Sequence, residues 1–198
     1  MITTCRSTDT PITIMQTALA TLRAEASVSA DGRETGGILL GHDPWTGCEG
    51  SAPGPLIRHT GDPGPDAVRR PTFFRRDYAH AQQLALDAFS QDRSEWVGEW
   101  HTHPRGPRHP SRADDRIYHR HIADSALNLD RFAALIVTPT LAWIDGRPRR
   151  SWRRIRCTAW IVDSRLSHRV RLVVVDGTKD GHRRPTGTLD PYAIGDSS

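Results

Sequence analysis

Two histidines and an aspartate are the residues of this 198-residue chain whose types and spacing best suit metal chemistry. His101 and His103 are separated by one residue, and Asp114 follows eleven residues after His103. Side chains alternate along a strand, so two histidines placed two residues apart on a strand point to the same side. Two neutral imidazoles and one carboxylate are a typical catalytic zinc set that leaves a position open for water. The pattern therefore predicts one zinc ion per chain, held by these three residues.

A zinc hydrolase also needs a base that takes a proton from water and returns it to the leaving amine. We expect Glu34 in this role, because it opens an expected strand and precedes Gly36 and Gly37, where backbone can approach a neighbour or ligand closely. Ser111 lies three residues before Asp114, on the same face of an expected helix. Its hydroxyl could hydrogen-bond the oxyanion that forms when hydroxide attacks a carbonyl, so we expect Ser111 as an oxyanion partner.

Each feature also has a simpler interpretation. An H-x-H pair arises easily in a chain with ten histidines, and S-R-A-D at 111–114 is also a capping box that satisfies the first amides of a helix. Glu34 near a turn would ordinarily be a surface carboxylate. The joint occurrence of all these features favours the metal site over the separate simpler interpretations.

Other zinc patterns fit this chain less well. A base deaminase needs H-x-E with a later P-C-x-x-C, and a zincin needs H-E-x-x-H on a helix; the sequence has neither. His109, His119 and His121 follow the ligands in sequence, but histidines near a site are more often surface or core residues than a second metal site. Glu99 and Trp100 are expected to support sheet packing or to orient an imidazole.

The elements that position these residues follow from the spacing of apolar residues. Strands are expected at 12–14, 38–40, 56–59, 96–101, 132–137, 141–144, 152–162 and 170–175, and helices at 15–28, 78–90 and 111–127. Asp77 is a plausible cap for the second helix, whose inward side chains would be Tyr78, Ala81, Leu84, Ala85 and Phe89. Three prolines exclude regular structure over 104–110, and we expect loops at 43–55 and 61–71.

Helices interleaved with apolar strands predict an α/β layered domain over 10–146. Residues 147–198 are expected to form a small β-rich C-terminal extension that ends in a loose polar tail. The strands of the extension could also complete the sheet of the first domain, which would make the boundary at 146 soft.

The net charge is +4 and the isoelectric point is about 9.4, but the cations are almost all arginine, with Lys179 the only lysine. We interpret this as a composition bias spread over the chain, so nucleic acid is not favoured as the main partner. The run RPRRSWRRIR at 147–156 is denser. Its ordinary interpretation is a solvated hairpin, and the alternative is an acidic or nucleic-acid partner.

Localisation is expected to be cytoplasmic. No window of the sequence approaches the ~20 apolar residues of a membrane span, and the N-terminus lacks a basic start followed by an apolar core. Cys5, Cys48 and Cys157 form neither a C-x-x-C pair nor a disulfide framework, which fits a reducing compartment.

The joint pattern resembles the JAMM motif, in which an upstream Glu is followed by H-x-H, seven residues, Ser, two residues and Asp. Here Glu34 is followed by TGGILLG, and HTHP at 101–104 is followed by Ser111 and Asp114 at the required spacing. FFRRDYAHAQQLALDAF at 73–89 and WVGEWHTHP at 96–104 further resemble bacterial JAB-domain proteins. The resemblance covers roughly residues 10–146.

The resemblance implies a deaminase-like JAB/MPN fold, with a central mixed β-sheet flanked by helices. It implies a JAMM-type zinc metallopeptidase that cleaves peptide or isopeptide bonds after the C-terminal glycine of a ubiquitin-like protein. His101, His103 and Asp114 would be the zinc ligands, Glu34 the general acid/base and Ser111 the oxyanion partner. The substrate would enter as an extended Gly-Gly tail, with contacts at the two loops, and proteins of a prokaryotic conjugation system would be partners.

Two other functions remain open at this point. A peptidase that processes a β-grasp sulfur-carrier protein would share the same chemistry. A non-catalytic MPN scaffold would be expected to lack a ligand or the glutamate, and this chain lacks neither. Nucleic-acid binding through 147–156 would be an accessory role.

Overall fold

The structure is a computed structural model, and it describes residues 10–43, 54–145 and 147–176. Apolar strands alternate with three α-helices and one short 3-10 helix in the described part of the chain. The elements are β1 (Ile12–Met15), α1 (Gln16–Ser27), η2 (Val28–Asp31), β2 (Gly36–His42), β3 (Leu56–Thr60), β4 (Val68–Arg70), β5 (Phe73–Arg75), α2 (Tyr78–Asp92), β6 (Glu95–Thr102), α3 (Arg112–Ala123), β7 (Arg131–Ile144), β8 (Arg147–Asp163), β9 (Ser167–Val170) and β10 (Leu172–Val175).

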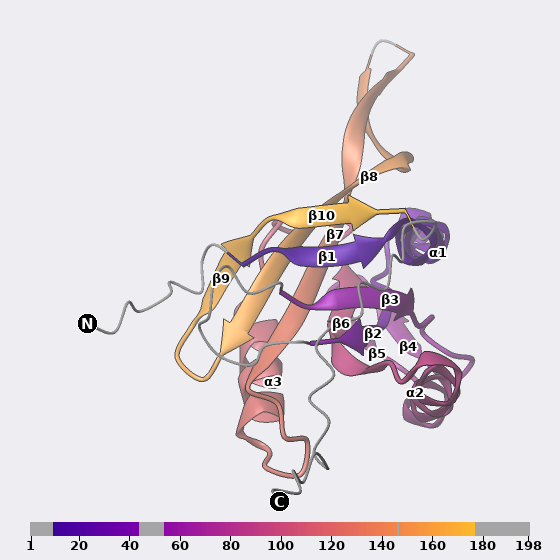
Figure 1. The fold of residues 1–198 in the computed structure, drawn as a ribbon. Helices are drawn as coiled ribbons and strands as arrows, with labels where there is room; N and C mark the ends of the chain where they lie inside the picture. The colour runs from indigo at the N-terminus through magenta and orange to yellow at the C-terminus, as the bar shows by residue number, and fades with distance from the viewer. Residues whose placement is uncertain (1–9, 44–53, 146, 177–198) are drawn as a thin grey trace, which may run out of the picture.

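Eight of the strands form one mixed sheet in the order β10-β1-β3-β2-β6-β7-β8-β9, and β4 pairs with β5 in a separate hairpin (Figure 1). The pairs β1–β10, β1–β3 and β6–β7 are parallel, and the others are antiparallel. The expected α/β class and mixed sheet are thus confirmed, whereas the deaminase-like detail stays a prediction. β6, which carries His101, lies in the interior of the sheet between β2 and β7.

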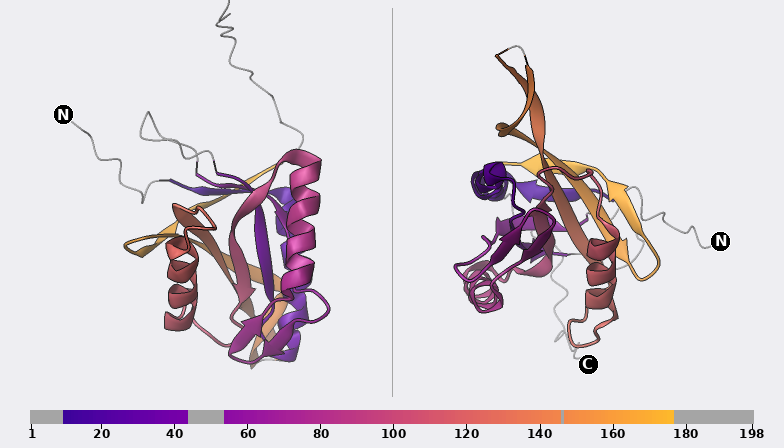
Figure 2. Two further views of the ribbon diagram at one scale, coloured as in Figure 1. Left: turned by 90° about the horizontal axis from the view of Figure 1, so that it is seen from below. Right: turned by 180° about the vertical axis from the view of Figure 1, so that it is seen from behind.

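Helices cover both faces of the sheet because successive strand residues are apolar on both sides. On one face, α1 packs Leu19 and Leu22 against a cluster that includes Leu135. On the other face, α2 packs against β2, and α3 packs Tyr118 against Phe132 of β7. Figure 2 shows α2 and α3 standing apart from one another. The end of β6 and the loop after it therefore lie on the face of the sheet that α2 and α3 cover.

Several element boundaries differ from the expected ones. α3 ends at Ala123, because Asp124 leaves the helical conformation, and does not reach Leu127. The expected strands at 132–137 and 141–144 are one long β7, continuous through a register shift at Pro139. The expected loop at 61–71 contains β4, and the expected strand at 170–175 is divided between β9 and β10.

Two of the side chains expected on the inward face of α2 are exposed, so that part of the prediction was wrong. Asp77 does cap the helix, since its side chain accepts from the His80 amide, and Ala81 is buried. Tyr78 and Phe89, however, are 65% and 42% exposed. Tyr78 is the first residue of the helix, where a cation from Arg76 lies over its ring, and Phe89 is covered by Arg93 in the same way.

The strands after residue 146 join the main sheet. β8 pairs with β7, and β10 pairs with β1 at the opposite edge, so the C-terminal strands lie at both ends of the strand order. Residues 140–144 of β7 pair with residues 147–151 of β8 in a hairpin that projects beyond the sheet (Figure 1), which confirms the expected hairpin, and we call these two strand ends the arm. The tail from Gly177 and most of the expected loop at 43–55 lie outside the described residues. The domain boundary at 146 stays a prediction.

Within the described chain, no helix has both the length and the apolar character needed to cross a bilayer. Cys157 is a free cysteine, and burial raises the pKa of its thiol to about 12, so it is protonated at neutral pH. Cys5 and Cys48 lie outside the described residues.

Candidate functional site

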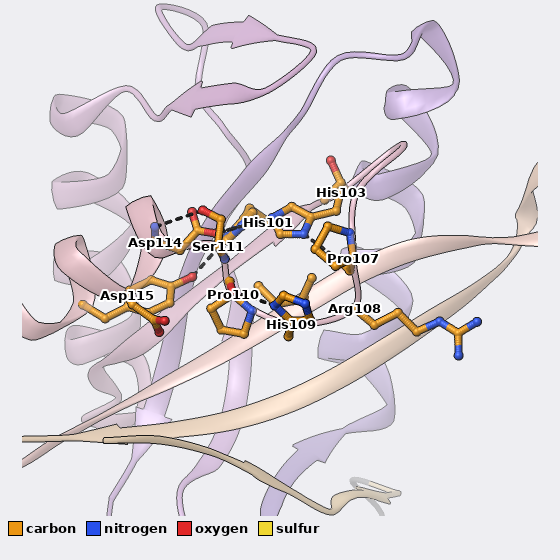
Figure 3. Close-up of polar contacts among 12 residues, drawn as sticks. His101, His103, Pro107, Arg108, His109, Pro110, Ser111, Asp114 and Asp115 are labelled. Atoms are coloured by element: carbon orange, nitrogen blue, oxygen red, sulfur yellow. Dashed lines mark hydrogen bonds and ion pairs between the residues drawn. The ribbon is translucent and has the colours of Figure 1, made fainter. Parts of the chain in front are cut away.

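Three ligand atoms converge at the end of β6. His101 Nε2 lies 2.9 Å from His103 Nε2, and Asp114 Oδ2 lies 3.5 Å from each of them (Figure 3). A tetrahedral zinc ion with ligands at about 2.0–2.1 Å holds its ligand atoms roughly 3.3 Å apart. The spacing of the three atoms therefore fits such an ion. Within the described ranges this is the one group of three or more His, Cys, Asp or Glu side chains with such converging atoms.

Thr102, between the two histidines, anchors the strand end that carries them. Its side chain points to the opposite face, where its hydroxyl lies 2.7 Å from Ser29 Oγ and accepts a 2.9 Å hydrogen bond from the Thr35 amide. All three of these residues are buried. Because Thr35 follows Glu34, the same contacts tie the glutamate segment to the histidine segment. The alternation of a strand thus gives both imidazoles to the site and the intervening hydroxyl to the scaffold.

Hydrogen bonds to the second ring nitrogens fix both imidazoles. His103 Nδ1 lies 2.8 Å from the Pro107 carbonyl oxygen, which only accepts, so Nδ1 donates and Nε2 is left with its lone pair. His101 Nδ1 lies 3.2 Å from the Tyr118 hydroxyl. Tyr118 is buried and stacks on Phe132, with ring centroids 5.1 Å apart. Its burial raises the pKa of the phenol well above the usual value, so the hydroxyl stays neutral.

Ser111 and Asp114 form the capping box at the start of α3, as the simpler interpretation predicted. The Ser111 amide donates to Asp114 Oδ2 at 2.6 Å, and the Asp114 amide donates to Ser111 Oγ at 3.2 Å. The capping box orients the carboxylate oxygen that lies closest to the two histidines, so the structural and metal-binding interpretations are compatible. The Ser111 hydroxyl accepts from the helix, which leaves its own hydrogen able to donate.

Contacts within the cluster shift the pKa values of Asp114 and His103 in opposite directions. Burial alone would raise the pKa of Asp114, but hydrogen bonds and charge from His101 and His103 outweigh it and hold the pKa far below its usual range. Burial alone would lower the pKa of His103, but the Asp114 carboxylate and the Pro107 carbonyl outweigh it and raise that pKa. The carboxylate is therefore ionised at neutral pH and is a ready partner for a cation.

Glu34 lines the same cavity as the three ligands, a space of about 340 Å³. Its amide donates to the Arg70 carbonyl of β4 at 2.8 Å, and Arg69 Nε donates to its carbonyl oxygen at 3.1 Å, so the β4 hairpin holds its backbone. Partial burial raises the pKa of the Glu34 carboxyl, although electrostatic attraction to His101 and His103 partly offsets the rise. A raised pKa suits a group that must take and return a proton.

Gly36 and Gly37 allow the close strand pairing that places Glu34 beside the histidines. A Cβ on Gly36 would lie 2.4 Å from the Trp100 carbonyl oxygen and 2.8 Å from His101 Cβ, and a Cβ on Gly37 would lie 2.0 Å from the Gly61 carbonyl oxygen. A side chain at either position would push β2 away from its neighbours. The expected close backbone approach is confirmed, and the group approached is neighbouring backbone.

The residues next to the site have separate roles. Trp100 is a packing residue, 1% exposed, whose indole donates to the Gly61 carbonyl at 2.9 Å. Glu99 lines the site cavity and pairs with Arg76, and His121 lies 3.6 Å from the same carboxylate oxygen. His109 and His119 each place Nδ1 at a backbone carbonyl, of Pro110 and Asp115 respectively.

Sequence reasoning missed the residues that orient the site. Thr102 and Tyr118 were not singled out, although Thr102 sits between two ligands and Tyr118 lies one helical turn after Asp114. The spacing of Tyr118 was thus a usable signal. The role of the Pro107 carbonyl had no such signal, because a backbone oxygen is present at every residue.

Three findings place the chain among known proteins. The family described as prokaryotic homologs of the JAB domain matches residues 15–155. A protein of Escherichia coli (strain TW11681) named CD-NTase/cGAS isopeptidase is 33% identical over 108 residues, which are 54% of this chain and 65% of that protein. The matched region thus spans slightly less than two thirds of the length of that relative. A solution structure of a Desulfitobacterium hafniense protein has a TM-score of 0.56 and 17% identity, over 86% of this chain and 97% of that one, and it shares the fold.

Proposed function

This chain belongs to the prokaryotic JAB-domain family, and we propose that it is a zinc-dependent isopeptidase that hydrolyses the bond after the C-terminal glycine of a ubiquitin-like modifier. The observation that carries the proposal is the convergence of His101 Nε2, His103 Nε2 and Asp114 Oδ2 in the cavity that Glu34 also lines. A non-catalytic scaffold has no need for such an arrangement, and in this chain no member of the set is missing.

The three converging residues would hold the zinc ion. When bound, zinc supplies Lewis acidity, which polarises a carbonyl and lowers the pKa of a neighbouring water to about 7. The Pro107 carbonyl would keep His103 in the tautomer that presents Nε2 to the metal, and the Tyr118 hydroxyl, accepting from Nδ1, would hold the His101 ring with Nε2 toward the metal. The capping box would hold the Asp114 carboxylate in place.

Proton transfer falls to Glu34. Its carboxylate would accept the proton of the attacking water and then deliver that proton to the leaving amine nitrogen, so that the side chain ends in the state in which it began. Its raised pKa makes the return of the proton easier than it would be for an exposed carboxylate. The Ser111 hydroxyl, which lines the same cavity, would donate to the carbonyl oxygen as negative charge develops there.

An extended C-terminal tail would fit along β5. Among the described residues, β5 pairs only with β4, and Phe73 and Phe74 of β5 line the site cavity. An added strand would gain backbone hydrogen bonds from that open edge, which is the recognition mode suited to a tail of small residues. Pro71 and Thr72, from the end of the expected loop at 61–71, line the same cavity. The name of the Escherichia coli relative supports a conjugation-system substrate for this chain.

The test measures zinc and cleavage in the same preparations. Wild type should hold about one zinc per chain by elemental analysis, and it should cleave one of a panel of fusions that join ubiquitin-like or β-grasp sulfur-carrier proteins to a reporter through a C-terminal glycine. Glu34→Gln should retain zinc and lose cleavage by about a hundredfold or more. Wild type that binds no zinc when zinc is supplied would overturn the proposal. Unchanged cleavage in Glu34→Gln would overturn the role of the glutamate.

A further inference from the structure

A row of exposed arginines leads away from the site toward the arm. One cavity of about 590 Å³ lies between the end of α1 and the base of the arm, and it shares Arg105 with the site cavity. A further cavity of about 430 Å³ shares Trp152 and Arg153 with it. The two cavities thus adjoin one another and the site cavity through these shared residues, and we call the pair of cavities the arginine trough. Its cations are Arg23, Arg105, Arg150, Arg153 and Arg154.

The five arginines of the trough are exposed, and no Asp or Glu lines either of its two cavities. Arg105, at the end next to the site, also lines the site cavity with Glu34 and Asp114. In the part of the chain that the structure describes, none of the five forms an ion pair, whereas Arg58, Arg69 and Arg76 each pair with a carboxylate. Like charges gathered on one surface raise the local concentration of anionic ligands and steer them inward. The surface is therefore complementary to a partner with several negative charges.

The trough is fixed relative to the metal ligands. Trp152 packs against the core cluster beneath α1, which anchors the base of the arm to the sheet. Arg150 Nη1 donates to the Pro104 carbonyl at 2.9 Å, and Pro104 directly follows His103. A ligand in the trough would thus be held at a set distance from the scissile bond, as a substrate subsite requires.

We propose that the arginine trough binds an acidic segment of the substrate protein on the leaving-group side of the scissile bond. The inference rests on the proposed function. Phe73 and Phe74, at the edge proposed for the incoming tail, line the site cavity and neither described cavity of the trough, and a chain that continues past the metal ligands over Arg105 enters the trough. Carboxylates on that chain would meet guanidinium groups, which bind them in a planar, paired geometry.

A polypeptide suits the trough better than nucleic acid does. Grooves for single-stranded nucleic acid combine cations with a succession of aromatic platforms. Trp152 is the one aromatic residue that lines the two described cavities, and it is partly buried against the core. The trough also begins at a site proposed to cleave a peptide bond.

Binding is tested first, without any need for cleavage. The probes are short fluorescein-labelled peptides of alternating Glu and Gly, or of Gln and Gly, and fluorescein-labelled oligothymidine, each titrated with the full chain in a fluorescence anisotropy assay. The Glu peptide should bind more tightly than the Gln peptide, with an affinity that falls as salt rises. The triple variant Arg23→Gln, Arg153→Gln, Arg154→Gln should weaken it on the order of tenfold.

A matched triple variant controls for net charge. Arg165, Arg169 and Arg171 are also exposed and lie near β9 and β10, outside the trough, so their change to Gln should leave peptide binding nearly unchanged. Equal losses in the two triple variants would overturn the proposal, since net charge alone would then explain binding. Oligothymidine that binds more tightly than the Glu peptide, with the same loss in the trough variant, would overturn it in favour of nucleic acid.

Cleavage assays then test on which side of the scissile bond the acidic segment lies. A fusion with an acidic block after the scissile bond should be cleaved with a higher kcat/KM than one with a Gln block, and the advantage should disappear in the trough variant. The same block placed before the scissile bond should give no advantage. An advantage only from that position would overturn the assignment to the leaving group. If no fusion is cleaved by wild type while the trough still binds the Glu peptide, the proposed function fails and the acidic binding surface does not.

Discussion

Two clusters in this molecule each join histidine to an aspartate and have different properties. In the first, His101, His103 and Asp114 place three ligand atoms around one point. In the second, Arg58 and His59 of β3 meet Asp92 at the end of α2, where Asp92 Oδ2 lies 2.7 Å from Arg58 Nε and 2.9 Å from His59 Nε2. Both clusters join a strand to a helix, and in both the pKa of the aspartate is held below its usual range.

The guanidinium makes the difference. Arg58 is permanently charged and occupies the carboxylate oxygen that a metal would need, so the second cluster is neutralised within the protein. In the first cluster the uncharged Ser111 amide of the capping box orients the carboxylate, and no arginine pairs with it among the described residues. A histidine–carboxylate cluster is therefore a metal-site candidate when its carboxylate is held by neutral donors, and a structural ion pair when arginine holds it.

The largest expected effect separates the clusters by zinc content. His103→Ala removes one of the three converging atoms and should lower zinc affinity by more than about a hundredfold, which exceeds the usual cost of losing an orienting group. His59→Ala should leave about one zinc per chain. Elemental analysis after dialysis, followed by competition with a chromogenic chelator, measures both. Equal zinc content in the two variants would show that the difference between the clusters is not one of metal binding.

Tyr118→Phe tests the orienting contact within the first cluster. Loss of the hydroxyl leaves His101 Nδ1 without its 3.2 Å partner, so zinc affinity should fall about 10- to 100-fold while the ring still stacks on Phe132. Chelator competition gives the affinity, and circular dichroism checks the fold. Tyr78→Phe is the matched control, because Tyr78 is 65% exposed and does not contact the cluster. Unchanged affinity in Tyr118→Phe would mean that the ring is held by packing alone.

The first cluster could be predicted from the sequence, and the second could not. The spacing of Glu34, His101, His103, Ser111 and Asp114 was readable because strand alternation and the helix turn are local periodicities. The structure brings all five to one cavity. Their roles as ligands, base and oxyanion partner stay predictions.

The features that the sequence did not predict depend on tertiary contacts between residues far apart in the chain. Tyr118 became an orienting candidate only when α3 was placed over β7, and the role of Thr102 depends on where Ser29 and Thr35 lie. Exposure of Tyr78 and Phe89 was predicted wrongly because helical periodicity identifies an apolar face without saying how much of it another layer covers. The neutralising pair of Arg58 and Asp92 joins residues 34 positions apart, which no local pattern indicates.

The smallest expected effect concerns acid stability of the second cluster. Partial burial alone would raise the pKa of Asp92, but hydrogen bonds from Ser94, His59 and Arg58 outweigh it and hold the pKa below the ordinary 3.8. Since the pKa is depressed in the folded state, the contribution of Asp92 is fully present above the ordinary value of 3.8 and is lost as the pH falls below that value toward the folded pKa. Asp92→Asn should therefore lower the free energy of unfolding by about 1 kcal/mol at pH 7, a modest value because the partners are partly exposed.

The difference in unfolding free energy between wild type and Asp92→Asn should narrow as the pH is lowered from 7 toward 3, because wild type alone loses this contribution. Urea denaturation of zinc-free protein measures it, so that release of metal from the first cluster does not contribute. Asp130→Asn, a change at an exposed carboxylate, should leave the free energy of unfolding nearly unchanged at both pH values. A difference that stays constant from pH 7 to pH 3 would indicate that Asp92 stabilises the fold through the shape of its hydrogen bonds, which asparagine disrupts, and not through its charge. The neutralised ion pair would then no longer explain why the two clusters differ.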